Sequence, residues 1–122
     1  MIMPFEECFD GIWEVVIKST VEGAGDACLR ADDIFKPGSI LADIVDAIRT
    51  ADYIIADLTR QNPNVYYELG FAHALNKPVI LLTSDISTLP FDVKQQRVIE
   101  YTDTASGAAE LRDTLRKYMD KV

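Results

Sequence analysis

Residues 51–83 read ADYIIADLTRQNPNVYYELGFAHALNKPVILLT, and this stretch decides the fold. Its two ends, YIIAD and PVILLT, are short, continuous and apolar, which is typical of strands buried on both faces. Between them Asn62 precedes Pro63, a favoured N-cap residue followed by a residue favoured at the first helical position. A helix over about 63–76 between two such strands predicts a parallel βαβ unit.

The rest of the chain repeats this alternation. Apolar runs predict further strands at 1–5, 26–31 and 97–101. Stripes at helical spacing predict three more helices, with these side chains inward: Phe9, Ile12, Trp13, Val16 and Ile17; Ile40, Leu41, Ile44, Val45 and Ile48; Leu111, Leu115, Tyr118 and Met119. We therefore expect residues 1–122 to form one α/β domain, a three-layer flavodoxin-like or Rossmann-like fold. Its five-stranded parallel sheet would have strand order 2-1-3-4-5, with helices on both faces.

Composition excludes several classes of function. The net charge of −8 argues against binding nucleic acid or an anionic membrane surface, both of which favour basic proteins. No apolar run reaches the ~20 residues of a membrane-spanning helix, and no secretory signal is visible. The two cysteines, Cys8 and Cys28, are expected to be free thiols in the cytoplasm. With His73 as the single histidine, neither a metal site nor a cofactor is expected.

Glu68 is the residue of greatest interest in the central helix. Each helical residue turns by ~100°, which places Glu68 between Ala72 and Leu75, on the side that faces the sheet. An inward carboxylate is costly unless it is hydrogen-bonded, paired or protonated. Three interpretations stay open. The carboxylate lies at the mouth of a ligand site, or it fixes a loop by accepting hydrogen bonds from backbone amides, or the helix is rotated about its axis relative to this assignment and Glu68 is exposed to solvent.

The opposite side of this helix carries little charge. It presents Tyr66, Tyr67, Gly70, His73 and Ala74, and a helix with so small a polar face is usually covered on both sides. We expect a homo-oligomer that packs through this face; a tyrosine-rich free surface is the alternative.

In a parallel sheet, ligands bind where the strands end, so the loops after each strand supply further candidates. These are Met3, Pro4 and Phe5; Arg30, Asp32 and Asp33; Asp57, Thr59, Arg60 and Asn62; Thr83, Ser84 and Asp85. Gly38 and Ser39 precede a helix, where backbone N–H groups bind phosphate or the serine simply caps the helix.

Two longer segments resemble a known family. Residues 31–83, ADDIFKPGSILADIVDAIRTADYIIADLTRQNPNVYYELGFAHALNKPVILLT, and residues 3–16, MPFEECFDGIWEVV, are similar to nucleoside 2-deoxyribosyltransferase-like proteins and the related bacterial TIR-like nucleotide-binding domains. The combination of IADLT, NPNVYYELG and AHALNKPVI carries the resemblance. One difference is that QNPNVYY stands where the transferases carry an Asp-x-Gly-Thr-like stretch.

The resemblance implies an enzyme that cleaves or transfers at the N-glycosidic bond of a nucleoside, nucleotide or NAD-type substrate. It places the catalytic glutamate at Glu68 and a strand-end acid at Asp57. Such a carboxylate stabilises an oxocarbenium-like transition state or forms a covalent sugar intermediate. Asp57 or Asp32 would assist departure of the base. The substrate-binding residues would include Asn62 and Asn64 for sugar hydroxyls, and Phe5, Tyr67 or Phe71 for the base. The alternative is a non-catalytic nucleotide-sensing or self-assembling signalling module.

Overall fold

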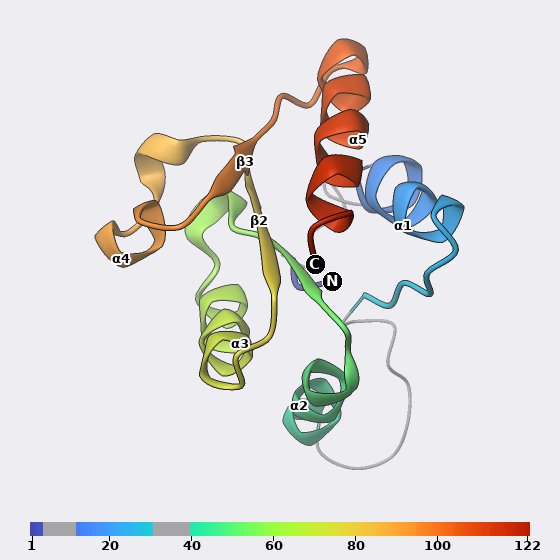
Figure 1. Ribbon diagram of the computed structural model, residues 1–122. Helices are drawn as coiled ribbons and strands as arrows, with labels where there is room; N and C mark the ends of the chain where they lie inside the picture. The colour runs from blue at the N-terminus through green and yellow to red at the C-terminus, as the bar shows by residue number, and fades with distance from the viewer. Residues whose placement is uncertain (4–11, 31–39) are drawn as a thin grey trace.

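The computed structural model describes residues 1–3, 12–30 and 40–122 (Figure 1). Within these residues the centre is a parallel sheet of three strands, β1 (Ile54–Asp57), β2 (Val79–Thr83) and β3 (Val98–Glu100), in the order β1-β2-β3. Ile54 pairs with Val79, and Leu81 pairs with Val98. The predicted βαβ unit and the parallel direction of its strands are therefore confirmed.

Of the predicted N-terminal strand at 1–5 the structure describes residues 1–3, which form one parallel bridge, between Ile2 and Ala56. Ile2 N–H donates to the Ile55 carbonyl, and Asp57 N–H donates to the Ile2 carbonyl, both at 2.8 Å. These groups point away from β2, so Ile2 extends the sheet on the other side of β1. The next residue but one in the sequence is Pro4, which has no N–H to give to a ladder.

The predicted strand at 26–31 is wrong for residues 26–30, which have no regular secondary structure. The Leu29 carbonyl accepts a hydrogen bond from the α-ammonium of Met1 at 2.8 Å and pairs with no strand among the described residues. The described residues thus contain the three later strands in the predicted relative order and a one-residue bridge for the first. A five-stranded sheet is not seen in them.

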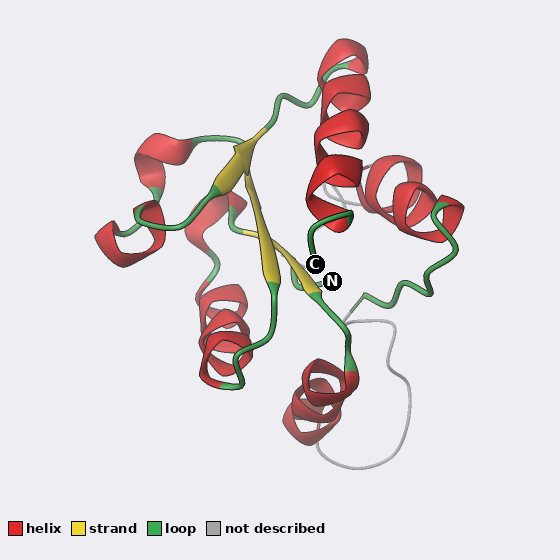
Figure 2. Cartoon of the chain, in the orientation of Figure 1, coloured by secondary structure: helices red, strands yellow, loops and turns green. Residues whose placement is uncertain are grey.

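Helices cover the sheet, as Figure 2 shows. In chain order they are η2 (Ile12–Lys18, a π-helix), α1 (Ser19–Gly23), α2 (Ile40–Thr50), α3 (Pro63–Ala74), α4 (Phe91–Lys94) and α5 (Ala105–Met119), with 3-10 turns at Thr59–Gln61 and Ile86–Thr88. None of the helices within the described ranges is both long enough and apolar enough to cross a bilayer.

The core consists of two apolar layers, one on each face of the sheet. Alternate strand residues point to opposite faces, so Ile55, Ile80 and Leu82 pack with η2, α1 and α5, whereas Ile54, Ala56 and Leu81 pack with α2 and α3. This confirms the predicted three-layer arrangement with helices on both faces.

Of the eleven predicted inward side chains that the structure describes, seven are buried: Ile12, Val16, Ile17, Ile44, Ile48, Leu111 and Leu115. Val45 is half-buried. Tyr118 and Met119 are half-buried against the same core. Leu41 is exposed, contrary to the prediction, because α2 reaches the core through Ile44 and Ile48, which lie one and two turns further along. Nothing is described for Phe9 or for the side chains of Trp13 and Ile40.

Candidate functional site

Asp57 ends β1 at the carboxyl edge of the sheet and is fully buried. One carboxylate oxygen, Oδ2, accepts a hydrogen bond from the Tyr101 hydroxyl at 2.6 Å. The other, Oδ1, accepts from the backbone N–H of Thr59 at 2.9 Å. With both oxygens occupied, Asp57 fixes the start of the loop that leads from β1 to α3.

Burial raises the pKa values of both Asp57 and Tyr101. It raises the pKa of Asp57 above its ordinary value of 3.8, while the hydrogen bonds from Thr59 and Tyr101 act in the opposite direction. The pKa of Tyr101 is also raised, first by burial and then by the charge of Asp57. The tyrosine hydroxyl therefore keeps its proton and acts as the donor.

Thr59 connects this pair to the next loop. Its Oγ1 accepts from Ser84 N–H at 3.0 Å and lies 3.4 Å from the Tyr101 hydroxyl. The predicted convergence of polar groups after β1 and β2 is thus present at the carboxyl edge. Tyr101 is the member that sequence reasoning missed, because it is 44 residues from Asp57 and reads as the last residue of an apolar strand.

Glu68 lies in the second turn of α3, with 6% of its surface exposed. Val65, Leu69 and Ala72 are buried on the same side of the helix, as the helical phase predicts. No group among residues 1–3, 12–30 and 40–122 hydrogen-bonds to its carboxylate, so neither an exposed glutamate nor one held by a described loop amide is observed.

Desolvation raises the pKa of Glu68 from 4.5 to about 7, and the α-ammonium of Met1 partly counteracts this shift. A carboxyl group with such a pKa exchanges its proton near neutral pH, which is the range in which general acids, general bases and carboxylate nucleophiles work.

The two predicted catalytic carboxylates are not brought together. Asp57 bonds to Tyr101, which belongs to the apolar layer beneath α5. Glu68 is on α3, whose buried residues Val65, Leu69 and Ala72 belong to the layer on the opposite face of the sheet. The alternation of strand side chains separates them.

The remaining predicted residues have diverse environments. Asn62 is confirmed as the N-cap of α3, since its Oδ1 accepts from Asn64 N–H at 2.9 Å. Asn64 is exposed in the first turn of α3. Tyr67 is 57% exposed, and its ring lies edge-on to that of Phe71, with 5.1 Å between the ring centroids.

Two further predicted binding residues, Met3 and Arg30, are buried, and Met3 belongs to the core. Pro4, Phe5, Asp32, Gly38 and Ser39 lie outside the described residues, as does Asp33.

A cavity of about 260 Å³ adjoins the Asp57 pair at the carboxyl end of β3. Its lining is rich in hydroxyl and carboxyl groups, namely Ser84, Glu100, Tyr101, Thr102, Glu110 and Thr114. Glu68 does not line it. In the described ranges no group of three or more His, Cys, Asp and Glu side chains is placed to hold a metal ion.

The three-layer parallel α/β fold, with a polar network at the carboxyl edge of its sheet, assigns this protein to the class of parallel α/β proteins. Members of this class bind small ligands at that edge of the sheet. Within this class the family is specific: the family model for nucleoside 2-deoxyribosyltransferase matches residues 26–114, and the chain belongs to that family. No curated protein matches the chain.

Proposed function

We propose that the protein cleaves or transfers at the N-glycosidic bond of a nucleoside, nucleotide or NAD-type substrate, with Glu68 as the nucleophile or the stabiliser of the oxocarbenium-like transition state. The observation that carries this proposal is the buried Glu68 carboxylate, which has no hydrogen-bond donor among the described residues. A group of this kind is costly to keep in a core. In a member of the nucleoside 2-deoxyribosyltransferase family, catalysis is a reason to retain it.

The chemistry requires few groups. A Glu68 carboxylate oxygen forms a bond to C1′ of the sugar as the C1′–N bond breaks, and the electron pair of that bond stays on the leaving base. The base of a neutral nucleoside then takes up a proton from solvent, whereas the cationic nicotinamide of NAD leaves as a neutral molecule without one. Water or the nitrogen of a second base then attacks C1′ and releases the carboxylate. A poorly solvated carboxylate favours this sequence because it stabilises positive charge at C1′ more strongly than a hydrated one does.

Other residues have supporting roles in this proposal. Asp57 acts as a positioning residue through Thr59 and Tyr101, since both of its oxygens already accept hydrogen bonds. Asn62 uses its oxygen as the helix cap and keeps its amide N–H groups for a sugar hydroxyl. Tyr67 is exposed on the outer face of α3, away from the inward Glu68, so we assign it to the oligomer contact and not to stacking on the base.

The test is release of free base, followed by chromatography, from purine and pyrimidine deoxynucleosides and from NAD. We expect release by the wild type and a loss of at least about 100-fold in Glu68→Gln, which keeps the shape of the side chain but removes the nucleophile. Glu22→Gln, at an exposed position on α1, is the matched control and should retain full activity.

The pH dependence supplies a second readout. If Glu68 acts in its ionised form, the rate should rise about ten-fold per pH unit below its pKa of about 7 and level off above it. A Glu68→Gln variant that releases base as fast as the wild type would refute the proposal. Thermal stabilisation by a nucleoside with no base release from any substrate would instead point to a sensing module.

A further inference from the structure

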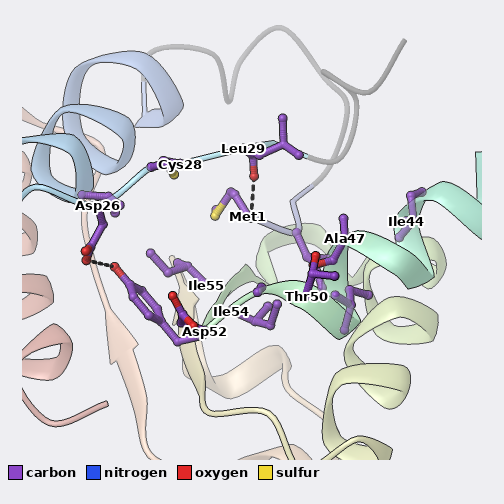
Figure 3. A pocket seen from close by; sticks show the side chains of 16 residues that line it. Met1, Asp26, Cys28, Leu29, Ile44, Ala47, Thr50, Asp52, Ile54 and Ile55 are labelled. Carbon is purple, nitrogen blue, oxygen red and sulfur yellow. Dashed lines mark hydrogen bonds between the residues drawn. The ribbon is translucent and has the colours of Figure 1, made fainter. Parts of the chain in front are cut away.

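A second cavity, of about 350 Å³, opens at the opposite, amino edge of the sheet (Figure 3). One wall is the segment 26–29, another is α2, and residues 50–55, which lead into β1, form the floor. Its volume falls in the range of small-molecule sites, ~300–1,000 Å³. Because residues 50–55 precede Asp57, this cavity is separate from the carboxyl-edge network.

The inner surface of this amino-edge cavity is aliphatic. It is formed by the buried side chains of Ile2, Val21, Ile44, Ile48, Ile54 and Ile55. Such a surface favours an apolar body, which leaves water when it enters.

The rim of the same cavity is acidic. Asp26 and Asp52 are exposed carboxylates, and the Tyr53 hydroxyl donates to Asp26 Oδ2 at 3.1 Å. Burial, the hydrogen bond to Asp26 and the charges of Asp26, Cys28 and Asp52 raise the pKa of Tyr53 to about 12. The tyrosine therefore stays neutral, and its hydroxyl lies at the rim beside Asp26.

Two cationic groups beside the cavity donate to backbone carbonyls. The Met1 α-ammonium donates to Leu29 O at 2.8 Å, and Lys77 Nζ donates to Ala51 O at 2.9 Å. In the part of the chain that the structure describes, neither Asp26 nor Asp52 forms a salt bridge, so both carboxylates can attract a positive ligand group, and the face of an aromatic ring attracts the same group.

We propose that the amino-edge cavity binds a small molecule with an apolar body and a protonated amino group. The body lies between α2 and the residues leading into β1, and the ammonium lies against Asp26, Asp52 and the Tyr53 ring. This inference is independent of the proposed function, and its test uses no measurement of activity.

The probe is 4-phenylbutylamine, compared with 4-phenylbutan-1-ol, which has the same apolar body and a hydroxyl in place of the ammonium. Binding is measured by calorimetry and by the rate at which iodoacetamide alkylates Cys28, a half-buried cysteine that lines the cavity. The other cysteine is removed by Cys8→Ser. We expect the amine to slow alkylation and to bind about five-fold more tightly than the alcohol.

Two sets of variants locate the site. Asp26→Asn combined with Asp52→Asn changes two exposed side chains and should abolish the advantage of the amine while leaving alcohol binding unchanged. Ala47→Phe, on the α2 wall, should fill the cavity and abolish binding of both probes. The matched control, Ala109→Phe on the exposed side of α5, should bind as the wild type does.

Equal affinity for amine and alcohol, no protection of Cys28, or protection that survives in folded Ala47→Phe would overturn the proposal. If Ala47→Phe does not fold, the Asp26 and Asp52 pair decides: an amine preference that persists without both carboxylates also overturns it.

Discussion

At the scale of single residues, burial of Glu68 is the feature with the clearest thermodynamic signature. Its pKa is about 7 in the folded protein and near 4.5 when solvated. Between these values the folded state binds more protons than the unfolded state, so the free energy of unfolding falls as pH rises from about 4.5 to about 7. Below this window both states are protonated, and above it the cost of the buried charge is fully present.

Glu68→Gln removes that cost. We expect the variant to match the wild type near pH 4.5 and to be more stable above pH 7 by on the order of 1 kcal/mol, a modest figure because the carboxylate keeps some solvent contact. Thermal melts of both proteins across this pH range measure the difference. A constant gap between the two curves at every pH would show that ionisation of Glu68 is not its cause.

Tyr101 is the second residue with a defined energetic role. Tyr101→Phe leaves a buried Asp57 oxygen without its donor, which is expected to lower the free energy of unfolding by about 1–3 kcal/mol. Tyr118→Phe, at a half-buried tyrosine of α5 with no hydrogen bond to Asp57, is the control and should change stability by less than about 0.5 kcal/mol. Denaturant unfolding of both variants provides the comparison, and equal losses would argue against a role for the Asp57 bond.

At the scale of elements, the start of α5 depends on a close approach. Thr104 caps the helix by accepting from Gly107 N–H at 3.0 Å, and Gly107 lies so near Thr102 that a Cβ there would overlap the Thr102 carbonyl oxygen and hydroxyl. α5 in turn supplies Leu111 and Leu115 to the core. A glycine is therefore required for this helix to begin directly beside the end of β3.

Two glycine substitutions should have opposite effects. Gly107→Ala is expected to cost about 2 kcal/mol or more, because the backbone oxygen of Thr102 cannot move away without disturbing the loop. Gly70 lies in the middle of α3, and a Cβ added there would meet open space. Gly70→Ala should therefore raise the free energy of unfolding by up to about 1 kcal/mol, because alanine has the higher helix propensity. Urea melts at low protein concentration test both, and a neutral Gly107→Ala would contradict the close approach.

At the scale of the whole molecule, the outer face of α3 bears on assembly. Tyr67, Gly70, His73 and Ala74 are exposed there, whereas Tyr66, predicted for the same face, is half-buried and packs against the α2 and α3 layer of the core. The prediction of a homo-oligomer now depends on Tyr67 and its neighbours, with Leu75 also exposed at the end of the helix.

We expect Tyr67→Arg to shift the protein toward the monomer mass of 13.6 kDa, since a charge in an apolar contact is poorly solvated. Val15→Arg makes the same kind of change at an exposed residue of η2, on the other side of the sheet, and should leave the mass unchanged. Size-exclusion chromatography with light scattering gives the masses. A wild type that elutes as a monomer at high concentration would exclude assembly through this face.

The sequence by itself determined the local features of this protein. The apolar runs around Ile55 and Leu81, the cap at Asn62 and the inward phase of Glu68 follow from patterns within one or two turns or a single strand, and the structure agrees with each. These patterns are legible because periodicity of burial is a local property of helices and strands.

Tertiary structure alone decided how distant parts meet. It placed Ile2 beside Ala56, joined Tyr101 to Asp57 across 44 residues, and set Asp57 and Glu68 on opposite faces of the sheet. It also formed the amino-edge cavity from segments that are far apart along the chain. Such contacts depend on which strands pair and in which register, and no local periodicity encodes that choice.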